Sequence, residues 1–80
     1  MIINVKQTHI DKGVARSFTR CAIALAIKDT FGVSSGVYVE GNIVGVNGRE
    51  YNTSRSARRF IKVFDKNKSN CKPFNFKLDA

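Results

Sequence analysis

The sequence predicts a small α+β domain with the element order strand–helix–strand–strand–strand–helix–strand. Residues 17–32, SFTRCAIALAIKDTFG, are apolar at every position in the middle, which is typical of a buried helix. Residues 55–66 separate apolar and basic side chains at helical spacing, which predicts a second, amphipathic helix. Short β-branched segments divided by tight turns lie between them. We therefore expect two helices packed on one face of a mostly antiparallel sheet, and a split-βαβ (ferredoxin-like) order with an added strand is one candidate topology.

The first third of the chain contains a strand, a short helical turn and the core helix. Ile3 and Val5 alternate with polar residues, which indicates a half-buried strand. Thr8 and the acid three residues later have the spacing of a capping arrangement, so residues 8–12 are expected to form a helical turn that stops at a glycine. Ser17 is expected to cap the core helix, and Gly32 to adopt the left-handed conformation at its end.

The remaining elements follow from turn chemistry and periodicity. Residues 37–39, Ile43–Val46 and Arg49–Asn52 read as a three-stranded meander, and Asn47-Gly48 is a strong hairpin signal. The second helix spans Arg55–Lys66. After a polar loop, Pro73 opens the last strand, in which Phe74, Phe76 and Leu78 share one face.

Composition limits the classes of protein. Eighty residues form one domain, 1–80, near the lower limit for an independent core, and a homodimer would bury more surface. The net charge of +8 attracts phosphate, anionic lipid or acidic protein. The apolar run of residues 21–27 is too short to cross a bilayer, and the apolar face of the second helix is needed to cover the sheet, so we expect no membrane contact. No secretory signal is recognised, so we expect a cytoplasmic location. Two distant cysteines without a C-x-x-C pair indicate reduced thiols and no metal site.

No recognisable enzymatic motif is present. His9 is the only histidine and has no companion nucleophile at a motif spacing, and the six acids are scattered. There is no Walker loop, no G-x-G-x-x-G and no H-E-x-x-H. We therefore expect a protein without catalysis, without a cofactor and without a metal.

The second helix carries the most informative polar pattern. Hydroxyl groups and guanidinium groups gather at its start, and arginine supplies planar paired donors that fit phosphate oxygens. Lysines continue the positive charge along the helix and beyond it to Lys68 and Lys72. The alternative interpretation is an ordinary solvated helix face with a serine cap. The expected ligand-binding residues are Ser54, Arg55, Ser56, Arg58, Arg59, Lys62 and Lys66.

Aromatic side chains could add base stacking to such a site. Phe60, Phe64, Phe74 and Phe76 follow the periodicity of the core and are interpreted as packing residues. The two tyrosines, at positions 38 and 51, stay open as stacking candidates, with the second expected to face inward.

The chain also resembles a set of small proteins encoded mainly by bacteriophages. The segments that carry the resemblance are Val5-Lys6-Gln7-Thr8-His9-Ile10 with Gly13, Cys21-Ala22-Ile23-Ala24-Leu25-Ala26, Phe60-Ile61, Phe64-Asp65 and Pro73-Phe74-Asn75-Phe76-Lys77-Leu78. In those proteins a proline often follows the cysteine, where this chain has Ala22. The resemblance implies a phage or prophage origin and the cytoplasm of an infected bacterium, and it implies no activity.

These observations favour a non-enzymatic protein that binds a phosphate-bearing ligand, either nucleic acid or a nucleotide, on the second helix. Two alternatives stay open. The chain could be a phage-encoded inhibitor that docks on an acidic host protein, such as an enzyme or an antiviral defence complex. It could instead be a dimer that sequesters a signalling nucleotide.

Overall fold

The computed structural model describes residues 1–78 and confirms the α+β class. Along the chain the elements are β1 (Ile2–Val5), α1 (Gln7–Lys12), α2 (Ala22–Phe31), β2 (Val37–Glu40), β3 (Ile43–Val46), β4 (Arg49–Asn52), α3 (Arg55–Lys66), a short 3-10 turn η1 (Lys68–Asn70) and β5 (Phe74–Lys77). The amphipathic helix and the strand meander lie where the sequence places them. The hairpin signal is also confirmed, because Asn47 and Gly48 both have positive φ angles, of 51° and 85°.

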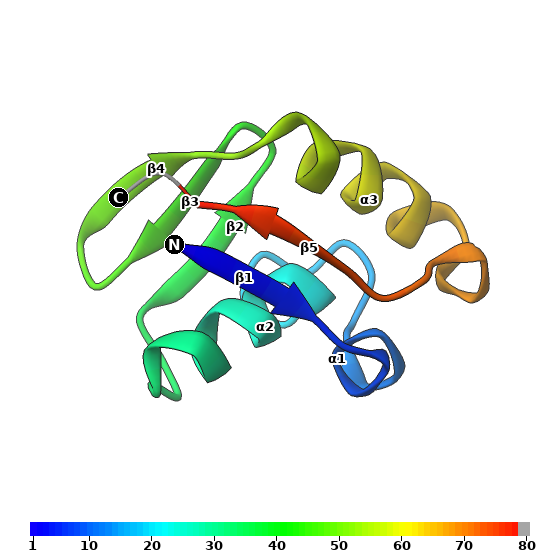
Figure 1. The fold of residues 1–80 in the computed structure, drawn as a ribbon, viewed down its shortest axis with the longest axis horizontal. Helices are drawn as coiled ribbons and strands as arrows, with labels where there is room; N and C mark the ends of the chain where they lie inside the picture. Colours follow the sequence, from blue (N-terminus) through cyan, green and yellow to red (C-terminus); the bar gives the residue numbers. More distant parts are fainter. Residues whose placement is uncertain (79–80) are drawn as a thin grey trace.

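The strands form two sheets rather than the single sheet expected. β1 pairs with β5, and β2, β3 and β4 form a separate meander (Figure 1). Every strand pair among residues 1–78 is antiparallel. The ferredoxin-like candidate is wrong because it needs one continuous sheet in which the first and last strands lie beside the central ones, whereas here they form a sheet of their own. The two sheets are separate because α2 packs against both β1 and β2 and its apolar side chains fill the space between them.

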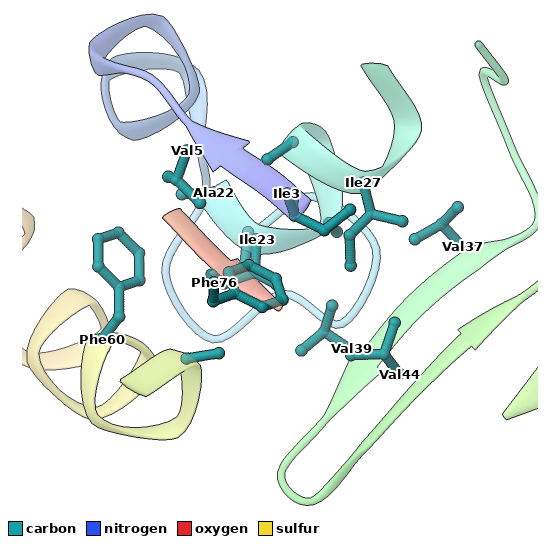
Figure 2. Close-up of a cluster of buried hydrophobic side chains, with 14 of the residues drawn as sticks. Ile3, Val5, Ala22, Ile23, Ile27, Val37, Val39, Val44, Phe60 and Phe76 are labelled. Atoms are coloured by element: carbon teal, nitrogen blue, oxygen red, sulfur yellow. The ribbon is translucent and has the colours of Figure 1, made fainter. Parts of the chain in front are cut away.

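The core surrounds α2 on several sides. Ile23 and Ile27 are buried, and side chains from both sheets converge on them, including Ile3 from β1 and Val39 and Val44 from the meander (Figure 2). An apolar helix of this kind is stable only when neighbours cover most of its circumference. Gly32 ends the helix with a φ of 69°, as predicted.

The start of the core helix differs from the prediction. The helix begins at Ala22, and Ser17 is not its cap. Residues 17–21 form a turn instead, in which the Ser17 hydroxyl accepts a hydrogen bond from the Arg20 N–H. The Phe18 carbonyl accepts a hydrogen bond from the backbone N–H of Val39 on β2, at 2.7 Å. This bond to a distant strand competes with helix formation, and it leaves the Phe18 side chain 60% exposed instead of in the core.

The first short helix, α1, is stabilised by hydrogen bonds from a distant residue, which its own sequence does not predict. It begins one residue before the predicted turn, so Thr8 lies inside it and does not cap it. Lys68, which follows α3, donates from Nζ to the carbonyls of Asp11 and Gly13 at the carboxyl end of α1. A cation at this end of a helix satisfies free carbonyl groups. Lys68 is therefore engaged in the fold and does not extend the basic surface of α3.

An aromatic row holds α3 against the β1–β5 ladder. The ring of Phe60 stacks on Phe64 at 5.7 Å and on Phe74 at 4.7 Å, and Phe74 continues to Phe76 at 5.8 Å. Ala57 completes the buried face of the helix. The interpretation of these phenylalanines as packing residues is confirmed, and their contacts fix which face of α3 is turned outward.

The crowded position of Gly13 leads to a first prediction. A Cβ atom at this residue would lie 2.8 Å from the Ala22 nitrogen, the His9 carbonyl oxygen and the Phe64 ring. Two of these atoms belong to the backbone, so Gly13→Ala should lower the free energy of unfolding by about 1–3 kcal/mol, as overpacking does. Urea denaturation measures the change. Val14→Ala, at an exposed neighbouring position, is the control, and equal midpoints for the two variants would contradict the packing argument.

Candidate functional site

The exposed face of α3 is a continuous row of positive side chains. We call Arg55, Arg58, Arg59, Lys62 and Lys66 the basic stripe, and all five are exposed. Their spacing of three and four residues places them within an arc of about 100° on a helix of 3.6 residues per turn. The row is about 16 Å long at 1.5 Å per residue. The predicted basic residues are therefore brought together on one surface.

Part of the basic stripe borders a hollow next to the meander. Four of its side chains, from Arg55 to Lys62, line an open hollow of about 390 Å³ together with Asn42 of the β2–β3 turn. The carbonyl of Asn42 accepts a hydrogen bond from the Thr53 N–H at 2.8 Å, which ties this turn to the start of α3. The hollow therefore has one positively charged wall and one neutral polar wall.

The charges of the basic stripe are not neutralised within the described part of the chain. Across residues 1–78 no acidic side chain lies within ion-pair distance of these five cations, and none of the five side chains donates a hydrogen bond. Uncompensated like charges on one surface create a positive potential that attracts anions. The arrangement is suited to binding a ligand with several negative charges spaced along its length.

The serines at the start of α3 have different roles. Ser54 is the N-cap, and its hydroxyl accepts a hydrogen bond from the Ala57 N–H at 3.2 Å. Ser56 is exposed, with its hydroxyl 3.2 Å from that of Ser54. The Ser54 hydroxyl therefore stabilises the helix, while the guanidinium groups beside it are left for a ligand.

The two candidate stacking tyrosines lie on opposite faces of the meander. Tyr51 is opposite Val44 and packs against the core, as expected. Tyr38 is on the outer face, where its ring crosses Gly45 so closely that a Cβ atom there would be 2.0 Å from the ring. Its hydroxyl donates to Glu50 Oε2 at 2.8 Å. The contacts of both tyrosines are thus with the sheet or the core, and neither residue lines the hollow beside the basic stripe.

A second hollow, of about 340 Å³, is next to His9, a residue for which the sequence predicts no catalytic role. His9 is buried, and its Nδ1 accepts a hydrogen bond from the Lys6 N–H at 2.9 Å. Nε2 therefore carries the ring proton, and it lies 2.5 Å from Asp29 Oδ2 on α2. Both ring nitrogens are occupied, so His9 has no free lone pair with which to act as a base. The pair joins α1 to α2.

The bond between His9 and the Lys6 N–H could have been predicted from the sequence spacing. Lys6 is the N-cap of α1 and His9 is its third residue, which is the spacing at which a capping-box side chain reaches back to the N-cap N–H. The other partner, Asp29, comes from 20 residues away, so the local pattern contains no sign of it.

The cysteines have no feature of reactive thiols. Both are free thiols. Burial raises the pKa of the Cys21 thiol above its ordinary value, and partial burial does the same for the pKa of Cys71. A raised pKa keeps a thiol protonated and makes it a poor nucleophile. Residues 1–78 also contain no group of three or more His, Cys, Asp or Glu side chains placed to hold a metal ion.

Comparisons with protein-family models, with curated proteins and with solved structures find no match, so the function is argued from the site itself. Among the described residues, none of the helices has the length and apolar character needed to span a membrane.

The contacts of His9 predict a measurable role in stability. His9→Ala would leave the Lys6 N–H without its acceptor and remove the link to α2, so the free energy of unfolding should fall by about 1–3 kcal/mol. Asp29→Asn is the matched variant, because its amide oxygen can still accept the bond from Nε2, and we expect a smaller loss. Chemical denaturation compares the two, and an unchanged midpoint for His9→Ala would refute the linking role.

The Tyr38–Glu50 bond predicts a pH effect at alkaline pH. The hydrogen bond to Glu50 raises the pKa of Tyr38 above its ordinary value, because ionisation would remove the donated proton and leave two negative charges together. The folded state thus holds this proton more tightly than the unfolded chain. The bond stabilises the fold below a pH of about 10, and its contribution disappears as the pH rises through the raised pKa.

Tyr38→Phe tests this directly. The phenolate absorbance of the wild type and of the variant is titrated with pH. The difference between the two curves is the titration of Tyr38, and its midpoint should lie above the ordinary pKa of tyrosine. The stability advantage of the wild type over Tyr38→Phe should shrink over the same pH range. A missing phenol that titrates at its ordinary pKa would show that the bond to Glu50 does not form in solution.

Proposed function

We propose that this protein binds a phosphate-bearing ligand, nucleic acid or nucleotide, on the basic stripe of α3 and performs no catalysis there. One observation carries the proposal: five cationic side chains form one row on a helix whose other face is packed into the core, and none of them is paired within residues 1–78. The helix backbone that carries the row is already ordered, so binding a polyanion has to order the side chains but not the backbone. The resemblance to phage-encoded proteins supports the cytoplasm of an infected bacterium as the setting, and the homodimer stays a prediction.

The length of the basic stripe favours a nucleic acid over a single nucleotide as the ligand. In a stacked strand, phosphates recur at about 3.4 Å of helix rise and they lie farther apart in an extended strand, so a row of about 16 Å spans at most four to five of them. Arginine pairs its planar donors with phosphate oxygens, and the three arginines lie in the first half of the stripe, beside the hollow. Nucleic acid therefore matches the whole row, whereas a mononucleotide matches the arginine end alone.

The salt dependence of binding tests the proposal. If about four phosphates are neutralised, the affinity for a single strand should fall roughly 50-fold between 50 and 200 mM salt. Arg58→Ala combined with Arg59→Ala should weaken binding by roughly tenfold or more and lower the slope against log salt by about 1.4. Fluorescence anisotropy with a labelled oligonucleotide measures both quantities.

The control is a double variant with the same loss of charge elsewhere. Arg20→Ala combined with Arg49→Ala removes two exposed arginines outside α3 and should keep most of the affinity and the slope. Equal effects of the two double variants would mean that net charge alone drives binding, and the proposal would be wrong. A defined protein that is retained from nuclease-treated bacterial lysate, without any nucleotide affinity, would favour the inhibitor alternative instead.

A further inference from the structure

Beside the basic stripe is a groove of different character, which the proposed function does not use. The groove lies between α3 and residues 70–74 and measures about 280 Å³. Its surface is mainly apolar, formed by Phe60 and Val63 of α3 and by Pro73 and Phe74 at the start of β5, with Arg59 and Lys72 at its edge. The groove is shallow, and its volume is just below the range of about 300–1,000 Å³ for small-molecule sites, so it has room for one ring system at most.

The groove and the basic stripe are continuous. Arg59 lines both the groove and the hollow described above. Val63 lies four residues after Arg59 and three before Lys66, so its side chain is between two cations on the helix surface. Val63 is 42% exposed, although an apolar side chain among charges gains nothing from contact with water. A ligand that follows the basic stripe would thus pass directly beside the groove.

The apolar surface and the neighbouring positive charges of the groove favour a particular kind of ligand. The exposed apolar surface comes from Val63, Pro73 and the partly exposed Phe74, while Phe60 lies beneath them, stacked on Phe64 and Phe74. The two lining cations, Arg59 and Lys72, favour an anionic molecule over a neutral one. A nucleobase has a flat ring and is attached to phosphate, so it meets both requirements at once. In a duplex the bases are stacked inside and cannot enter such a groove, whereas unpaired bases can turn outward and stack on protein side chains.

We infer that the ligand is single-stranded nucleic acid, with an unpaired base in the groove formed by Phe60, Val63, Pro73 and Phe74 and the neighbouring phosphates on the basic stripe. This inference rests on the proposed function and narrows its ligand class. Phosphates give affinity without regard to the bases, and the groove adds a requirement for an unpaired base. DNA and RNA share this chemistry, and parallel oligothymidylate and oligouridylate probes tell them apart.

The test compares three probes of equal length by fluorescence anisotropy: a single-stranded oligothymidylate, the same backbone with abasic sites, and a duplex. The intact single strand should bind roughly tenfold more tightly than the abasic strand, the size of one base-stacking contact. It should also bind more tightly than the duplex. Val63→Gln should lower the affinity for the intact strand to that for the abasic strand while the salt dependence stays unchanged. Val14→Gln, at another exposed apolar position, should have no effect.

Two failures are distinguishable. If intact and abasic strands bind equally, or the duplex binds best, with steep salt dependence in each case, the groove inference is overturned and the proposed function stands. If no probe binds, the groove inference is overturned, and the proposed function falls with it when a free nucleotide also fails to bind. Cys71 also lines the groove and gives a second readout. Its alkylation should slow when the protein is saturated with the intact strand but not with the abasic strand, and equal rates in both complexes would overturn the inference.

Discussion

The apolar contact between α3 and the β1–β5 ladder determines where the molecule presents its positive charge. Phe60 and Phe64 can be buried only if the helix turns the opposite face to solvent, and that face is the basic stripe. The orientation of the charged row is therefore a consequence of hydrophobic packing. Because β5 is itself held by β1, which packs on α2, the surface of α3 is supported by a continuous core.

The same helix carries an electrostatic cost. Like charges three or four residues apart destabilise a helix by roughly 0.2–0.5 kcal/mol per pair. Such pairs are Arg55–Arg58, Arg55–Arg59, Arg58–Lys62, Arg59–Lys62 and Lys62–Lys66, so their repulsion amounts to about 1–2.5 kcal/mol before screening by salt. No acid within residues 1–78 forms an ion pair that relieves it. A bound polyanion would remove this repulsion, so part of the binding free energy would come from relief of strain already present in the free protein.

Local patterns predicted the elements that depend on local physics, and they did not predict the contacts between distant segments. The bounds of α3 follow from its periodicity, and the turn at Asn47 follows from tolerance of positive φ. The predicted start of α2 was wrong. Ser17 has the side chain of an N-cap, but the Phe18 carbonyl is hydrogen-bonded to Val39 on β2, and the helix begins later, at Ala22. The division into two sheets and the apolar groove share this cause, since both depend on how residues far apart in sequence approach each other.

The grouping of five cations on one face of α3 is the main support for the proposed binding role of the basic stripe. Lys28 donates to the carbonyl of Thr19, and Lys68 donates to carbonyls at the end of α1, so these lysines stabilise turns and helix ends. The five side chains of the basic stripe make no such bond within residues 1–78, and neither do the exposed side chains of Lys12, Arg20 and Arg49. The basic stripe differs from those scattered cations because its five members share one face of a helix that has an N-cap and a packed apolar face without them. Folding therefore accounts for the apolar half of α3 and not for its charge. Repulsion among the cations of α3 would be relieved by phosphate groups, and the exposed apolar surface of the neighbouring groove would be covered by a base. A base attached to phosphate would therefore match both features.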